Sequence, residues 1–205
     1  MKQNLSHFLD CILLSMLLAV LALASTAQAQ DWNYTTNDNT VTIIGWRATD
    51  NPVSLSIPSS IEGLPVVKIG NLAFDGMHSL VSVSIPSSVT SLGNSAFGDC
   101  DHLTSVTIPN SVTNIQSGAF YGCTRLTSLT LGNGLLNLKQ KAFSWCLSLP
   151  SVTIPDSVTN IGPSAFAYCT NLASFTIGNS VITIEDRAFS ECYNLTSVLR
   201  TSLIS

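Results

Sequence analysis

The cysteines are the residues of this chain best suited to chemistry, because five of them recur at a fixed spacing of 23 residues. They are Cys100, Cys123, Cys146, Cys169 and Cys192. Cysteines in an exported protein can pair as disulfides, and thiolates can bind zinc. No CxxC pair or histidine at ligand spacing accompanies them, which argues against zinc. Met77 takes the same position in the first repeat, where a disulfide partner would be needed, so we interpret the set as a column of buried free thiols.

His78 and His102 lie in two successive turns beside Asp99 and Asp101, and imidazoles next to carboxylates suit metal binding or acid–base catalysis. We interpret all four as solvated turn residues, because their positions fall between the repeats. The sequence has no glycine-rich phosphate loop, no nucleophile elbow and no HExxH motif. We therefore expect no catalytic residue, no cofactor and no metal ion, and a protein that is not an enzyme.

A second set of residues with the same spacing, the phenylalanines, indicates which elements position these residues. Six phenylalanines fall 23 residues apart, namely Phe74, Phe97, Phe120, Phe143, Phe166 and Phe189. A fixed period of this length is typical of a solenoid, in which one short unit stacks on copies of itself. The sequence thus predicts that most of the chain is a scaffold.

One repeat, residues 103–123, shows what each unit should form. Its opening, Leu-x-x-Val-x-Ile-Pro, predicts a strand that ends at the proline. Val112 and Ile115 point inward again on a short second side, and Gly-x-x-Ala-Phe-x-x-Cys predicts one helical turn. The expected fold class is therefore an α/β solenoid of stacked parallel strands with short helical or 3-10 turns. The strands are expected at 53–57, 81–85, 104–108, 127–131, 150–154, 173–177 and 195–198.

The chain divides into four segments. Residues 1–29 combine Lys2, an apolar run and the small residues around Ala29, which predicts a signal peptide cleaved after Ala29. The apolar run is too short for a membrane span, so we expect export without membrane insertion after cleavage. Residues 30–52 should form an N-terminal cap with a hairpin, and 53–198 the repeats, the first with an insertion at 61–65. Residues 199–205 are a short tail.

The units from Ile85 onward follow the pattern Ile-Pro-x-Ser-Val-Thr-x-Ile-x-x-x-Ala-Phe-x-x-Cys, and Trp32-x-Tyr34 opens the cap. In these features residues 31–198 resemble the BspA-like leucine-rich repeats of bacterial secreted and surface proteins. The resemblance implies a leucine-rich-repeat solenoid that serves extracellular binding or adhesion. It implies no catalytic residue.

Two surfaces are candidates for binding. Outward residues of the strands form columns of hydroxyls that include Ser105, Thr107, Ser128, Thr130, Ser151 and Thr153. This surface could recognise a glycan, a peptide edge or ice, or its serines and threonines could be soluble strand residues copied by repeat duplication. Aromatic residues gather on the helical side, namely Tyr121, Trp145, Tyr168 and Tyr193. Such residues are typical of binding hot spots, although their rings could also fold down over the loops.

The predicted function is protein binding or adhesion by a secreted, cell-surface or periplasmic protein, without catalysis. A glycan-binding module and a structural spacer of a larger surface assembly are the alternatives. The chain has 12 acidic and 8 basic residues, so it offers no basic surface for nucleic acid. We expect no nucleic-acid partner.

The C-terminal segment departs from the repeat. Leu199 and Arg200 replace the expected Thr-Ile, which places Arg200 in a core column and predicts that the strand ladder stops after Val198. The remaining residues could fold over the last repeat, the sequence could be truncated, or the last strand could pair with another chain. An uncovered final repeat predicts self-association.

Overall fold

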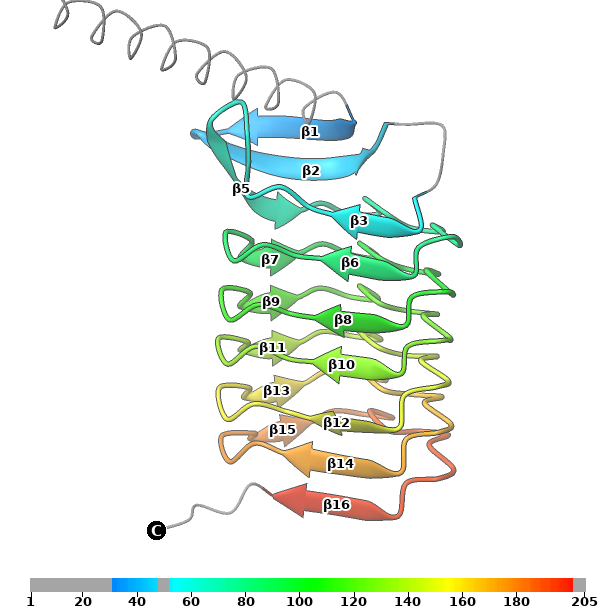
Figure 1. Cartoon of the computed structure of the whole chain (residues 1–205). Coiled ribbons are helices and arrows are strands. Elements are labelled where there is room, and N and C mark those ends of the chain that lie inside the picture. The colour runs from blue at the N-terminus through cyan, green and yellow to red at the C-terminus, as the bar shows by residue number, and fades with distance from the viewer. Residues whose placement is uncertain (1–30, 48–51, 201–205) are drawn as a thin grey trace, which may run out of the picture.

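The computed structural model describes residues 31–47 and 52–200, which wind into a stack of similar turns, called rungs here (Figure 1). Each rung has a strand on one face, a shorter strand on a second face, and a long turn segment that closes it. The predicted signal peptide and the cleavage site at Ala29 lie outside the described residues. Residues 31–47 and 52–200 contain no helix with the length and hydropathy needed to span a bilayer.

The first face carries the strands predicted from the repeat pattern, and all but the last lie at the expected positions. They are β3 (Ser54–Ser56), β6 (Ser82–Ser84), β8 (Ser105–Thr107), β10 (Ser128–Thr130), β12 (Ser151–Thr153), β14 (Ser174–Ile177) and β16 (Ser197–Arg200). Paired neighbours are parallel and in register, as in Ser128↔Ser105 and Thr130↔Thr107. The expectation that the ladder ends after Val198 is wrong, because β16 pairs with β14 as far as Ile177↔Arg200. Arg200 is accommodated there because its side chain is exposed.

The second face is a nine-stranded sheet that runs the length of the stack. Its strands are β1 (Trp32–Asn37), β2 (Thr40–Trp46), β4 (Ser60–Ile61), β5 (Leu64–Ile69), β7 (Ser91–Leu92), β9 (Asn114–Ile115), β11 (Asn137–Leu138), β13 (Asn160–Ile161) and β15 (Thr183–Ile184). The insertion predicted at 61–65 turns at Glu62 and Gly63 and forms the antiparallel pair β4–β5.

The core is filled by the columns that the repeat pattern places inward. Phe97, Phe120 and Phe143 are fully buried, and their rings stack at centroid distances of 5.2 Å. Parallel strands repeat at roughly 4.8 Å, so each ring lies directly over its equivalent in the next rung. Stacked rings bury a large apolar area, so this column contributes to the stability of each rung.

The N-terminal cap predicted for residues 30–52 contains the expected hairpin. Strands β1 and β2 are antiparallel, and β2 continues the second face through parallel pairing with β5. Trp32 is buried and sets its ring edge-on against Phe74, with centroids 6.1 Å apart. The hairpin thus covers both the first strand edge and the end of the phenylalanine column, which a solenoid terminus requires.

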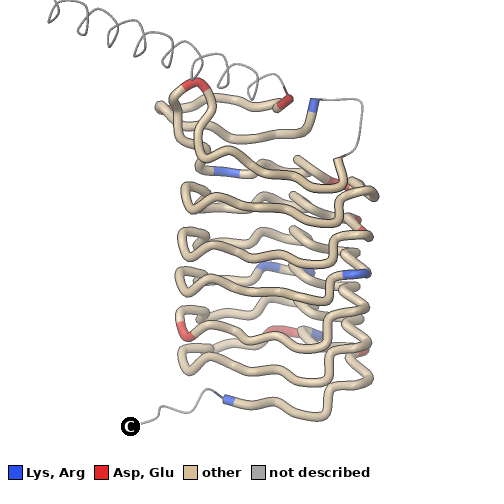
Figure 2. Tube along the Cα trace, in the orientation of Figure 1, with Lys and Arg blue, Asp and Glu red and all other residues tan. Residues whose placement is uncertain are grey.

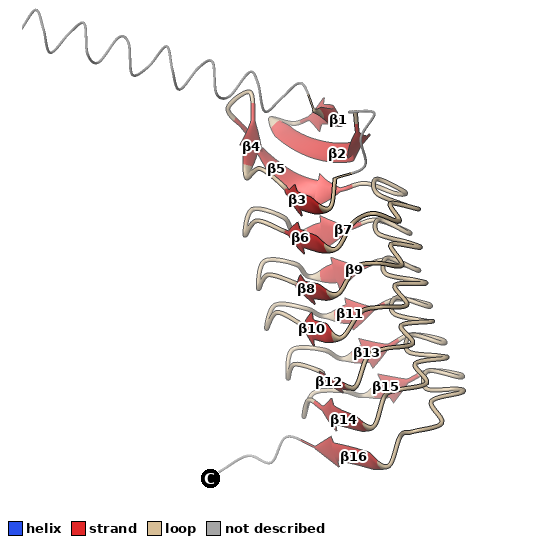
Figure 3. Ribbon diagram, turned by 45° about the vertical axis from the view of Figure 1, so that its right-hand side comes forward, coloured by secondary structure: helices blue, strands red, loops and turns tan. Residues whose placement is uncertain are grey.

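The helical turns predicted for each repeat are not formed; the described residues contain no helix, and loops occupy these positions (Figure 3). In the rung of Phe120 every second amide bonds to the next rung: Phe120 N donates to Ala142 O at 2.8 Å. The amides between them bond three residues back, as Tyr121 N does to Gly118 O at 2.8 Å. Gly118 and Gly122 have φ of 64° and 72°, which a right-handed helix excludes. Bonding between rungs therefore replaces bonding within a helix.

The interpretation of the cysteines as buried thiols is confirmed. All five are free, four are buried and Cys192 is half-buried. Each thiol donates to the carbonyl oxygen of the phenylalanine 26 residues earlier, as Cys123 does to Phe97 O at 3.3 Å. Burial raises the pKa of the Cys100 thiol to about 12. The column is thus a packing element with a weak hydrogen bond to the preceding rung.

The strands of the first face do not form one continuous sheet. One sheet has the order β10-β8-β6-β3, and a second has the order β12-β14-β16. At the boundary, Pro150 occupies the repeat position that Thr127 has in the preceding rung. The amide of Thr127 donates to Thr104 O at 2.9 Å. Proline has no amide hydrogen, so the equivalent bond from Pro150 is missing and the two sheets separate there.

Charged side chains are sparse along the rungs (Figure 2). Strands β6 to β14 of the first face carry none, so their outward surface is polar without being charged. Most charges lie on turns, and the turn segments are where the candidate site is found.

Candidate functional site

The turn segments bring two of the predicted aromatic residues together on the surface. Trp145 and Tyr168 belong to successive rungs, and their rings stack with centroids 4.6 Å apart and planes 19° from parallel. We call this pair the aromatic stack. Trp145 is 40% exposed and Tyr168 39% exposed, so the rings remain accessible.

The other two predicted aromatic residues differ in their relation to the stack. Tyr121 is half-buried and lies next to Trp145, with which it lines one recess of the surface. Tyr193 is 75% exposed, and its hydroxyl donates to the carboxylate of Glu191. Three of the four predicted aromatic positions are therefore contiguous, and Tyr193 lies in the next rung, bonded to Glu191, which occupies the turn position of Tyr168.

The backbone of the aromatic stack is in the left-handed region, with φ of 65° at Trp145 and 61° at Tyr168. The same turn position is occupied by Gly76, Asp99, Gly122 and Glu191 in the other rungs, and Asp99 and Glu191 are also left-handed, with φ of 50° and 62°. A non-glycine residue in this conformation costs about 1–2 kcal/mol, and bulky residues are rarely found there. Two large aromatic side chains thus stand where the backbone favours glycine.

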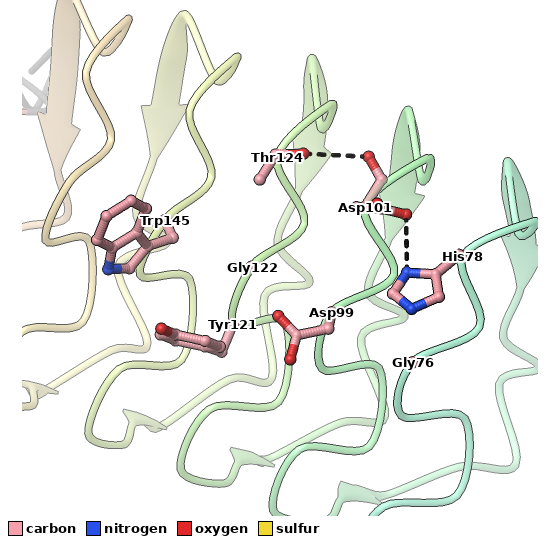
Figure 4. Close-up of a pocket in the computed structure, with 8 residues that line it drawn as sticks. All are labelled: Gly76, His78, Asp99, Asp101, Tyr121, Gly122, Thr124 and Trp145. Atoms are coloured by element: carbon pink, nitrogen blue, oxygen red, sulfur yellow. Dashed lines mark hydrogen bonds and ion pairs between the residues drawn. The ribbon is translucent and has the colours of Figure 1, made fainter.

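A recess of about 380 Å³ opens beside the aromatic stack, and we call it the edge recess. It is lined by Gly76, His78, Asp99, Asp101, Tyr121, Gly122, Thr124 and Trp145 (Figure 4). The carboxylate of Asp99 lies over Gly122, where a Cβ would overlap its Oδ1. Gly76 has no atom within 4 Å of the position of a Cβ, so nothing fills that side. The two glycines leave the space around Asp99 open.

Two histidines converge on one carboxylate at the rim of the recess. Asp101 Oδ1 lies 3.2 Å from His78 Nδ1 and 3.0 Å from His102 Nδ1. The hydrogen bond from His102, and then that from His78, lowers the pKa of Asp101. His78 and Asp101 are 23 residues apart, so they occupy one column on adjacent rungs. That spacing was visible in the sequence and would have predicted the pair.

Two further carboxylates face each other without a basic partner. Asp75 lies over Gly98, where a Cβ would overlap its Oδ1. Partial burial, together with the negative charge of Asp99, raises the pKa of Asp75. Asp75 was not identified from the sequence, because its proximity to Asp99 depends on how the turn segments stack.

The six predicted hydroxyl residues all point outward from the first face and are exposed. Those of β8 and β10 are in register, and those of β12 pair with β14 beyond the break at Pro150. Ser105 and Thr107 also line a groove of about 310 Å³ with Val83 and Ser84. The surface is therefore interrupted and grooved, where one uniform array was expected. Its role in binding stays a prediction.

The chemistry available in the edge recess is recognition by charge, hydrogen bonds and aromatic faces. Within residues 31–47 and 52–200, no group of three or more histidine, cysteine, aspartate or glutamate residues could hold a metal ion. The Thr124 hydroxyl donates to the backbone oxygen of Asp101 at 3.3 Å, so it is already engaged. Asp101 is occupied by two imidazoles, which leaves Asp99 as the carboxylate open to a ligand.

Comparison with known proteins agrees with this architecture. The family described as "BspA type Leucine rich repeat region" matches residues 46–144 and 93–204, with six copies. A search of curated proteins gives no match. Among solved structures, the leucine-rich repeat protein of T. pallidum (TpLRR) has 34% identity and a TM-score of 0.80, over 83% of this chain and 80% of that chain.

Two further structures are similar. A leucine-rich repeat protein from Bacteroides ovatus has 30% identity and a TM-score of 0.67, over 82% of this chain and 50% of that chain. The pneumococcal vaccine antigen PcpA has 20% identity and a TM-score of 0.50, over 84% of this chain and 47% of that chain. At that identity, the likeness to PcpA shows the fold alone.

Proposed function

Because the chain belongs to the BspA-type leucine-rich repeat family, we propose that it is an exported, non-enzymatic protein. It binds another protein through the surface formed by its turn segments, which we call the turn edge. The family and fold are typically non-enzymatic. The binding surface consists of the aromatic stack, Tyr121 and the edge recess. Export is supported by the leader pattern that ends at Ala29 in the sequence.

The stacking of the exposed Trp145 and Tyr168 rings is the observation that carries this proposal. Their left-handed backbone is shared by Asp99 and Glu191 at the same turn position, so the fold sets this conformation and only the side chain at that position varies. The rings are also preorganised, since each fixes the other by stacking. Exposed aromatic residues held in one conformation are typical of the residues that dominate binding energy at interfaces.

A glycan is the second candidate ligand. Aromatic rings with an open face stack on sugar rings, and the carboxylate of Asp99 beside Trp145 could accept hydrogen bonds from sugar hydroxyls. The hydroxyl residues of the first face, Thr107, Thr130 and Thr153 among them, would offer a separate surface for either ligand class.

The proposal is tested by comparing captured partners across variants. The intact protein, immobilised, is exposed to host matrix extract beside the Trp145→Ala/Tyr168→Ala double variant and a Thr107→Lys/Thr130→Lys/Thr153→Lys variant. We expect the double variant to lose specific partners that the wild type and the triple variant retain. Ile182→Ala is the matched control, because it removes an exposed apolar side chain beside β15 of the second face. If the double variant captures the same partners as the wild type, the turn edge is not the binding surface.

A further inference from the structure

We propose that the edge recess binds the guanidinium group of an arginine side chain from the partner protein, between Asp99 and the open face of Trp145. This inference rests on the proposed function, because it names the chemistry recognised at that same surface. Three features carry it: unpaired negative charge, an oriented aromatic face, and open space between them.

The histidines at the recess both bond to Asp101, and Asp99 has no basic partner in the described part of the chain. Asp75, Asp99 and Asp101 lie in two successive rungs, and no described lysine or arginine forms an ion pair with any of them. By contrast, the exposed Asp186 has Arg187 at 3.7 Å. Burial raises the pKa of Asp75, and the negative charge of the nearby Asp99 raises it further, so the two carboxylates repel each other. A bound cation would relieve this repulsion.

The aromatic face is oriented toward that charge. Tyr168, in the following rung, covers one face of the Trp145 indole. The opposite face therefore looks back along the stack toward Gly122 and Asp99, and Trp145 lines the recess on that side (Figure 4). Tryptophan is the aromatic residue that attracts cations most strongly.

The space between these groups suits a flat cation. Gly122 contributes no side chain, and Asp99 and Trp145 line the same recess of about 380 Å³. A guanidinium needs about 3.5–4 Å from the indole plane and about 3 Å from a carboxylate oxygen, and a recess of this volume has room for it. Arginine both stacks on aromatic rings and donates to carboxylates from one planar group, which lysine does not.

The experiment follows the indole N–H signal of Trp145 by NMR in the intact protein, assigned with Trp145→Phe. The probes are the capped peptides acetyl-Gly-Arg-Gly-amide, the Lys and Gln equivalents, and methyl β-glucoside. We expect saturable shifts with the Arg peptide, weaker shifts with Lys and none with Gln. Asp99→Asn should weaken Arg-peptide binding about tenfold, because a charge-assisted hydrogen bond is lost.

Asp186→Asn is the matched control, because it removes an exposed carboxylate elsewhere, and it should leave the affinity unchanged within about twofold. Equal shifts with the Arg and Gln peptides, or none with either, would overturn the proposal. Shifts with the glucoside alone would overturn it in favour of a sugar site. Loss of partner capture by Trp145→Ala/Tyr168→Ala without an Arg-peptide response would leave the binding surface supported and this inference wrong.

Discussion

At the scale of single residues, two groups of side chains differ: one group packs the core of the scaffold, and the other lies exposed on its surface. Phe120 and Cys123 belong to columns that recur along the stack, with Met77 at the cysteine position of the first rung, and both are fully buried, so packing accounts for them. Trp145 and Tyr168 do not repeat, are exposed and have a left-handed backbone. Their conformation opposes local stability, and only their mutual stacking, worth about 0.5–1.5 kcal/mol, offsets part of that cost.

The strain at Trp145 predicts an unusual order of stability among its variants. Trp145→Gly should be more stable than Trp145→Ala by about 0.5–1 kcal/mol, because both lose the stack but only glycine adopts φ of 65° without strain. Urea unfolding of both variants measures the difference. At the neighbouring Leu147, which is not in the left-handed region, alanine should be the more stable replacement. The same order at both positions would contradict the strain argument.

At the scale of elements, the two faces of the solenoid are held together differently. The second face pairs from rung to rung along the whole stack, whereas the first face breaks between β10 and β12. The break coincides with Pro150. At the same repeat position in other rungs, the amide donates to the preceding rung, as in Thr104, Thr127, Ala173 and Thr196. Core packing continues across it, since Phe143 and Phe166 stack with centroids 5.4 Å apart and planes 9° from parallel. A missing hydrogen bond is therefore tolerated where apolar burial is continuous.

Restoring the amide at this position should close the sheet. In Pro150→Thr we expect residue 150 to donate to Thr127 O, so that its amide is protected from hydrogen exchange. The added hydrogen bond contributes about 0.5–1.5 kcal/mol, partly offset because the unfolded chain loses the restriction of proline. Thr127→Pro is the reverse control and should destabilise the protein by removing the bond to Thr104 O. Rapid exchange of the new amide in Pro150→Thr would mean that the strands separate for another reason.

The strands and the core could be predicted from the sequence, because both follow from spacing alone. Phe97 and Val106 recur at 23 residues, and a side chain that recurs in a parallel stack must point the same way each time. The conformation of the turns could not be predicted in this way. Ala119, Phe120 and Cys123 have helical spacing, and nothing in that spacing reveals that Phe120 N bonds to the next rung instead.

The candidate site was only partly predictable for the same reason. Trp145, Tyr168 and Tyr121 were identified because they depart from the repeat. The edge recess depends on Gly76 and Gly122, because neither residue has a side chain that would fill it. Asp99 was identified only as a turn residue, because its position over Gly122 follows from the left-handed turns, which the sequence pattern did not indicate.

At the scale of the whole molecule, the two ends of the described stack differ. At one end Trp32 covers Phe74 and the hairpin β1–β2 covers the strand edge. At the other end two core positions are open: Ile184 is 46% exposed and Val198 57%, whereas their equivalents Ile161 and Val152 are 0% and 3% exposed. Among the described strands, β16 also pairs on one side only, with β14. Open core and a free strand edge together favour pairing with a further strand.

We therefore predict that the chain of residues 1–205 self-associates through the rung of β16. Analytical ultracentrifugation of the wild type should show mass increasing with concentration, because pairing buries Ile184 and Val198 and satisfies the edge of β16. Ile184→Lys/Val198→Lys should be monomeric at the same concentrations, since a buried lysine without a partner is strongly unfavourable. Val53→Lys is the control, because it changes a 62% exposed valine in the first rung. A monomeric wild type, or association that the double variant retains, would contradict pairing through this end.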